Sequence, residues 1–161
     1  MAPILTLRQP PNRLAGWLRC NRYNQRLIDY RQAVMNAAAF LAVGLGAACG
    51  AWIRWWLGTR LNPLLAHLPL GTLVANLSGG YLIGVALALF TVHHGLPHEL
   101  RLFVITGFLG ALTTFSTFSA EVVQLFHAAH YGWAVLTASV HLAGSLAMTA
   151  LGFWTIARLQ A

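Results

Sequence analysis

Apolar residues form four long runs along this chain, separated by shorter stretches that contain charged, turn-forming or histidine residues. The runs cover residues 35–57, 70–92, 99–126 and 133–157. Each run contains about 20 residues or more, the length that an α-helix needs to cross the hydrocarbon core of a bilayer. The pattern therefore predicts an all-α integral membrane protein with four transmembrane helices within residues 35–161.

Small and polar residues recur every four positions in three of the runs, so they lie along one face of each helix. The members are Ala42, Gly46, Gly50 and Arg54; Thr72, Asn76 and Gly80; and Thr137, His141, Ser145 and Thr149. The small residues suit close packing of a second helix. The polar residues either join buried helices or line a pathway, and the pattern alone leaves both interpretations open.

The third run holds an unusual mixture at residues 107–121. Five hydroxyl residues lie close together there, with Phe115 and Phe118 among them: Thr113, Thr114, Ser116, Thr117 and Ser119. Gly110 and Ala111 come just before, which favours an interruption of the third helix near its middle. Broken helices at membrane depth persist only where protein or a cavity satisfies the freed backbone groups. We therefore take this stretch as the functional centre.

Charge separates the first 34 residues from the rest. The chain is 58% hydrophobic and 8% charged; all ten basic residues are Arg, and six precede position 32, so residues 35–161 carry only about +2. Residues 1–34 form a basic N-terminal extension, for which the alternatives are a poorly ordered tail, an amphipathic helix over 14–30, or translation that starts at Met35. They lack the apolar core of a signal peptide. Because this charge sits in a tail, no nucleic-acid partner is expected.

The polar groups of the membrane region suit a small anion. Hydroxyl and amide groups donate hydrogen bonds, and aromatic rings are positive at their edges. Cation pathways more often use carboxylate rings or carbonyl filters, and Glu121 lies beyond the hydroxyl cluster, without an assigned role. Arg54 lies either at the membrane interface or in a vestibule. No paired acid and base stands at a usable spacing, so we do not expect an enzyme.

These residues resemble the Fluc (CrcB) family of fluoride channels. The resemblance rests on Gly46-Ala47, Gly50-Ala51 and Arg54, on Gly71-Thr72, Asn76 and Gly79-Gly80, and on Gly107-Phe108-Leu109-Gly110 followed by Thr-Thr-Phe-Ser-Thr-Phe-Ser through Glu121. It covers the chain from Met35 to its end. Two positions depart from the family pattern: Ala111, where a second Gly is usual, and His141, where a small hydroxyl residue is usual.

The resemblance implies a fluoride-specific ion channel that lowers cytoplasmic fluoride by passive export across the cell (inner or plasma) membrane. It implies an antiparallel, dual-topology homodimer with two narrow pathways and a central structural Na⁺. The ion pathway would then contain the ring edges of Phe115 and Phe118, the amide of Asn76, and hydroxyls of Thr72, Ser145 and Thr149. Backbone carbonyls of Gly110 and Thr113 would hold the Na⁺.

Two rival functions stand beside this hypothesis, and the distribution of Arg residues bears on the predicted dual topology. A small dual-topology four-helix proton-coupled exporter needs an acid early in the chain at membrane depth, and the first two spans contain none. A non-transporting assembly subunit would tolerate changes of the polar residues. The Arg residues that flank the spans are balanced, with Arg101 and Arg158 on one side against Arg54 and Arg60 on the other. Such balance permits both orientations, whereas the six Arg of the tail favour one.

Overall fold

The computed structural model describes residues 36–93 and 95–160, so the predicted N-terminal extension at residues 1–34 lies outside the described residues. Within them every regular element is helical. In chain order these are α2 (Ala37–Leu61), η1 (Asn62–Leu64), α3 (Leu70–Val92), α4 (His98–Arg101), η2 (Leu102–Leu109), α5 (Gly110–Leu112), α6 (Phe115–His127) and α7 (Tyr131–Leu159). Four helical stretches are long and apolar enough to cross a membrane: Ala37–Leu64, Leu70–Val92, His98–His127 and Tyr131–Leu159. The predicted four-helix membrane fold is confirmed at this level.

The first helix extends further than the sequence predicts. The sequence indicates a loop over residues 58–69, whereas α2 runs to Leu61 and the 3-10 turn η1 follows directly. Within that turn, the Asn62 Oδ1 atom accepts from the backbone N–H groups of Gly71 at 2.8 Å and Thr72 at 3.2 Å. Asn62 thereby satisfies two of the N–H groups that a helix start leaves unpaired. The turn and α3 are joined by this cap.

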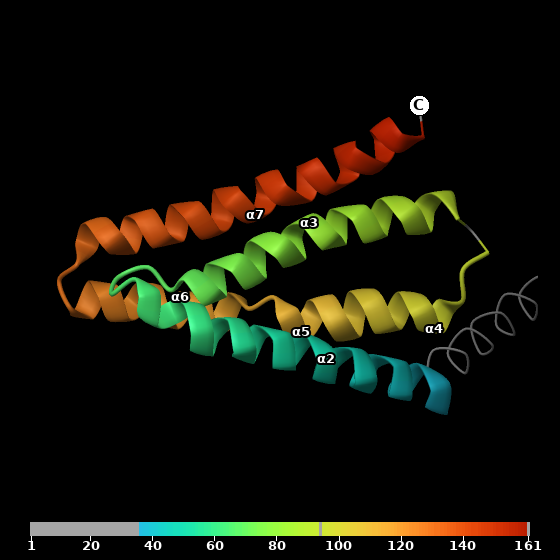
Figure 1. The fold of residues 1–161 in the computed structure, drawn as a ribbon, viewed down its shortest axis with the longest axis horizontal. Helices are drawn as coiled ribbons and strands as arrows, with labels where there is room; N and C mark the ends of the chain where they lie inside the picture. Colours follow the sequence, from blue (N-terminus) through green and yellow to red (C-terminus); the bar gives the residue numbers. More distant parts are fainter. Residues whose placement is uncertain (1–35, 94, 161) are drawn as a thin grey trace, which may run out of the picture. The chain divides into compact units, whose positions relative to one another are not determined.

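The small-residue row of α2 packs against the third span of the same chain. Figure 1 shows the two spans side by side. A Cβ atom on Gly46 would overlap the carbonyl oxygen of Phe103, and one on Gly50 would overlap the carbonyl oxygen of Phe108. These glycines therefore allow backbone-to-backbone contact within one subunit. Because the row is filled from within the chain, it does not itself support a partner, and the homodimer stays a prediction.

Helices α3 and α7 run side by side in the same direction, with a constant offset along their facing stripes (Figure 1). Asn76 is hydrogen-bonded to His141. One turn later a Cβ on Gly80 would meet the Ser145 carbonyl oxygen at 2.9 Å, and after a further turn Gly84 lies against the Thr149 carbonyl. The two stripes that the sequence predicts separately are thus one interface, polar at one end and glycine-lined at the other.

The third span is interrupted at its middle. It begins with α4, continues through the π-helical segment η2 and the short helix α5, and resumes as α6 at Phe115. Thr113 and Thr114 between them have extended backbone, with ψ of 151° and 113°. The structure therefore has the predicted break, but it places the break after Gly110 and Ala111, which are still helical.

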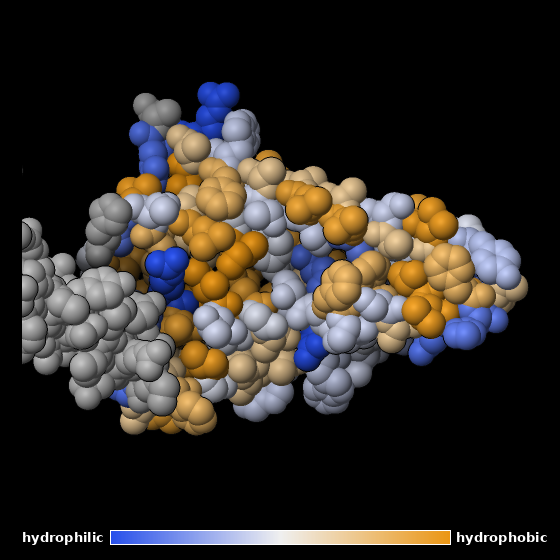
Figure 2. Space-filling model, turned by 180° about the vertical axis from the view of Figure 1, so that it is seen from behind, coloured by the Kyte–Doolittle hydropathy of each residue, from blue (hydrophilic) through white to orange (hydrophobic). Residues whose placement is uncertain are grey.

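Apolar side chains cover much of the outer surface of the described helices, as the face drawn in Figure 2 shows. Large side chains stand exposed on the first and last spans, among them Phe40, Trp52 and Leu146. A water-soluble fold would bury such residues, whereas lipid is their natural surrounding. The exposed surface therefore agrees with the membrane assignment made from helix length.

Candidate functional site

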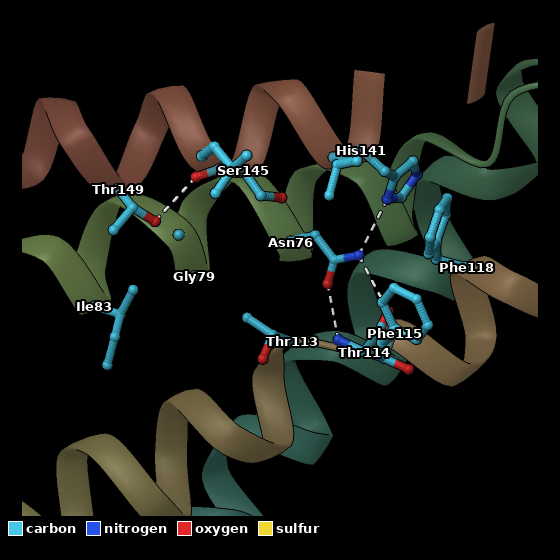
Figure 3. Close-up of a pocket in the computed structure, with 13 residues that line it drawn as sticks. Asn76, Gly79, Ile83, Thr113, Thr114, Phe115, Phe118, His141, Ser145 and Thr149 are labelled. Carbon is cyan, nitrogen blue, oxygen red and sulfur yellow. Dashed lines mark hydrogen bonds between the residues drawn. The ribbon is translucent and has the colours of Figure 1, made fainter. Parts of the chain in front are cut away.

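A pocket of about 280 Å³ opens beside the break of the third span. It is bounded by α3, α7 and the residues around the break (Figure 3). Five of the predicted pathway residues line it: Asn76, Phe115, Phe118, Ser145 and Thr149. The structure therefore brings together, from three separate spans, most of the residues that the sequence singled out.

Asn76 is held by the backbone of the break. Its Oδ1 atom accepts from the Thr114 N–H at 2.8 Å, and its Nδ2 atom donates to the Thr114 carbonyl at 3.1 Å. The backbone of Thr114 offers one donor and one acceptor, which fixes the orientation of the amide. The second N–H of Asn76 faces the Nδ1 atom of His141 at 3.1 Å. In this arrangement Asn76 bridges the break and has no proton left for an ion.

Thr114 also starts the second half of the broken span. Its Oγ1 atom accepts from the Thr117 N–H at 3.1 Å, which is an N-cap of α6. Because Thr117 N–H bonds to this hydroxyl and Thr114 N–H bonds to Asn76, the carbonyls of Thr113 and Gly110 lack the N–H four residues ahead that a continuous helix would give them. The carbonyls of Ala111 and Leu112 lie at the same helix end, so the break by itself does not single out the pair predicted to hold Na⁺.

The two predicted phenylalanines contact each other and differ in burial. The rings of Phe115 and Phe118 lie edge to face, with centroids 5.4 Å apart and an interplanar angle of 69°. Phe118 also stacks on the imidazole of His141, at 4.7 Å and 21°. Phe115 is 77% exposed in the single chain, so it is the freer of the two. Both rings form one end of the pocket wall.

The hydroxyls of α7 are not equivalent. Thr149 donates its proton to the Ser145 carbonyl at 2.9 Å, as membrane-helix threonines often do. Within the described part of the chain, the Ser145 hydroxyl makes no hydrogen bond. Ser145 can therefore donate to an ion in the pocket, whereas Thr149 can offer only a lone pair unless its rotamer changes.

Thr72 lies outside this pocket. Its hydroxyl is buried and donates to the Glu121 Oε1 atom at 2.6 Å. It borders a second cavity, of about 230 Å³, whose lining includes Arg54, Asn62 and Thr117. Arg54 therefore faces a cavity beside the break, and Glu121, which had no assigned role, is the acceptor for Thr72.

Sequence reasoning missed two features of the site. The backbone of Thr114 as the partner of Asn76 had no sequence signal, because any residue presents the same N–H and C=O. The pair formed by Thr72 and Glu121 joins residues 49 positions apart, although an acid inside an apolar span is itself a reason to look for a hydrogen-bond partner.

Comparison with known proteins identifies the family. Residues 41–153 match the family described as CrcB-like protein, Camphor Resistance (CrcB). Three similar proteins carry the name "Fluoride-specific ion channel FluC". The protein of Ralstonia pickettii is 60% identical over 122 residues, covering 76% of this chain and 97% of the relative. Those of Nitrosospira multiformis and Thiobacillus denitrificans are each 58% identical over 122 residues, covering 76% of this chain and 95% and 98% of the relatives. This chain is therefore a multi-pass membrane protein that belongs to the CrcB-like family.

Proposed function

We propose that this protein is a fluoride-specific ion channel that exports fluoride passively and so lowers its concentration in the cytoplasm. The observation that carries the proposal is the pocket beside the break, where the free Ser145 hydroxyl of α7 and the two phenylalanine rings of α6 border one cavity. Hydroxyl protons and ring edges both attract a small anion. The relatives named as fluoride channels are 58% and 60% identical to this chain over 95% and 97% of their own length.

The working unit in this proposal is an antiparallel homodimer in the inner or plasma membrane, with one narrow pathway bordered by each pocket. Phe115, which is exposed in the single chain, would then be covered by the second subunit. Fluoride enters the cell as the neutral weak acid and dissociates there, and the channel lets the anion leave down its electrochemical gradient. No protein acid has to take up or release a proton in this cycle, which distinguishes it from a proton-coupled exporter.

A central structural Na⁺ is also part of the proposal. The carbonyls of Gly110 and Thr113 would hold it, because the N–H groups that normally occupy them are bonded to Asn76 and Thr114 instead. Carbonyl oxygens are hard ligands of the kind that such cations prefer. The ion would supply positive charge that holds two broken helices together.

The test is fluoride efflux from liposomes that contain the purified full-length chain, followed with a fluoride electrode. We expect wild-type efflux that needs no pH gradient, and at least a tenfold loss in Phe115→Ile. The matched control is Phe40→Ile, since Phe40 is 82% exposed near the start of α2 and far along the chain from the break. Efflux that occurs only with an imposed pH gradient would favour the proton-coupled exporter, and no efflux at all would overturn the channel.

A further inference from the structure

A cavity of about 310 Å³ lies between the second half of α3 and the first half of the third span. Every described residue that lines it is apolar, among them Leu82 and Leu89 of α3 and Leu100 and Val104 of the third span. Leu82 and Leu89 are 39% and 36% exposed, so the cavity opens outward from the helices. In a membrane protein the surroundings at this depth are lipid chains. The protein therefore leaves an apolar gap between two spans that face the bilayer.

A polar cavity of about 220 Å³ adjoins this gap where the two spans end. Phe90 and Leu96 line both cavities, so the two form one groove, which we call the α3 groove. The polar end is bordered by His93, His98 and Arg101. These residues flank the link that joins α3 to α4 (Figure 1), where the chain reaches the surface of the membrane. The groove is thus apolar along the span and basic at its end.

Arg101 supplies the permanent positive charge of the basic end, because a guanidinium stays protonated at physiological pH. In the part of the chain that the structure describes, its guanidinium forms no ion pair or hydrogen bond, and the nearby Glu99 does not line the cavity. The Nδ1 atom of His93 lies 3.2 Å from the Leu89 carbonyl, which positions that ring at the helix end. An unpaired arginine at a membrane surface matches a phosphate group, which accepts two parallel hydrogen bonds from its planar fork.

The length of the α3 groove matches one leaflet of a bilayer. From Leu82 to Phe90 the groove-lining part of α3 rises about 12 Å. Half of a hydrocarbon core of about 30 Å is about 15 Å. The groove therefore offers an acyl chain contacts over most of the depth of one leaflet, and its basic end lies where the headgroup of that lipid belongs.

A second copy of this chain is the other candidate occupant, and the geometry of α3 disfavours it. The α3 residues that line the pocket beside the break are Asn76, Gly79, Gly80 and Ile83, and none of them lines the groove. With 3.6 residues per turn, Leu82 and Leu89 lie about 120° around the helix from Asn76 and Ile83. The face of α3 beside the exposed Phe115, which the second subunit would cover, is therefore a different face.

We propose that the α3 groove binds one anionic phospholipid, with an acyl chain between α3 and the third span and the phosphate at Arg101. Basic pockets between transmembrane helices are suited to the headgroups of such lipids. The bound chain would fill the gap that the protein leaves and so hold α3 against the first half of the broken span. This proposal does not depend on the transport function proposed above.

The test counts lipids bound to the purified full-length chain by native mass spectrometry, during titration with dioleoylphosphatidylglycerol or the zwitterionic dioleoylphosphatidylcholine. We expect one phosphatidylglycerol per chain to bind at least about fivefold more tightly than phosphatidylcholine, and Arg101→Gln to weaken it by about fivefold. Arg158→Gln is the matched control, because Arg158 is also exposed near a helix end and its guanidinium lies over the Trp154 ring at 5.3 Å. We expect its affinity to stay within about twofold of wild type.

A second variant tests the apolar part of the groove. In Leu89→Trp the larger side chain occupies space that the acyl chain would fill, so we expect phosphatidylglycerol to bind at least about fivefold more weakly, with the oligomeric mass unchanged. Leu136→Trp, at an exposed leucine of α7 that does not line the groove, is the control and should bind the lipid like wild type.

Several results would overturn the proposal. Equal affinity for the two lipids, or wild-type affinity in Arg101→Gln, would mean that Arg101 only reaches toward the membrane surface. Displacement of the lipid by millimolar inorganic phosphate would indicate a phosphate site without an acyl chain. If Leu89→Trp instead dissociated an oligomer and left lipid binding intact, the groove would belong to a second copy of the chain. Because Arg101 is exposed, its variant tests the proposal even if Leu89→Trp does not fold.

Discussion

Replacing Asn76 by alanine is the sharpest test of how the broken span is held. The side chain makes three hydrogen bonds, two to the backbone of Thr114 and one to His141. Alanine keeps helix propensity and leaves a space beside the break. The Thr114 N–H and C=O groups then lose the Asn76 amide, which takes the place of the helical partners that the break removes. The Nδ1 atom of His141 loses its hydrogen-bond donor as well.

The magnitude follows from these contacts. Side-chain hydrogen bonds in a membrane protein are worth about 0.6 kcal/mol each on average, so the three bonds account for about 2 kcal/mol. The two backbone groups of Thr114 remain in a residue that is 6% exposed, and each buried group left unpaired adds about 1–3 kcal/mol. Water that enters the pocket will hydrogen-bond to some of these unpaired groups and so lower this cost. We therefore expect a loss of about 3–5 kcal/mol in the free energy of unfolding.

The assay is reversible unfolding of the full chain in mixed micelles of increasing dodecyl sulfate content. Ser78→Ala is the matched control, because Ser78 is on the same helix and its hydroxyl bonds only to carbonyls of its own preceding turn. We expect it to change stability by less than about 0.5 kcal/mol. A loss below about 1 kcal/mol in Asn76→Ala would refute the reasoning, since the break would then be stable without the amide, and Asn76 would be free to serve an ion instead.

Two further predictions concern packing and the buried acid. Gly84→Ala should destabilise the fold by about 1–3 kcal/mol, because its Cβ would overlap the Thr149 carbonyl, whereas Gly44→Ala, with open space around it, should be neutral in the same unfolding assay. Thr72→Val should cost about 1–3 kcal/mol, because Glu121 loses its donor; recovery in Thr72→Ser, and not in Thr72→Ala, would show that the hydroxyl is responsible. Equal stability of Val and Ser at this position would contradict the role of the bond.

Span positions were predictable because they depend on a property that sums over many residues. The apolar runs gave four helices whose ends mostly agree with the structure, apart from α2, where the sequence indicated a loop from residue 58. The loop was predicted from residue 58 because Gly58 and Arg60 are typical of loops. Neither residue ends a helix by itself, and α2 continues to the turn at Asn62-Pro63. The break was expected from its composition, and its location needed the structure.

The roles of single donors could not be predicted, because they depend on rotamers and on contacts between distant residues. The sequence cannot show that Thr149 returns its proton to its own helix while Ser145 keeps one free. Nor does the sequence show that the amide of Asn76 bonds to the backbone of the break. The stripe of α7, in contrast, was predicted from its four-residue spacing alone. The structure adds that this stripe packs against the stripe of α3.

The facing stripes of α3 and α7 raise a problem of registration that their own repeat cannot solve. A translation of one helix by a single turn, about 5.4 Å, would again set small and polar residues against one another. The hydrogen bond between Asn76 and His141 breaks this repeat, because it joins the amide to the one imidazole of the stripe. A slip by one turn would set Asn76 against Thr137 or Ser145 instead, while Thr114 of the third span still holds its amide. This single pair therefore distinguishes one alignment of an otherwise repetitive interface.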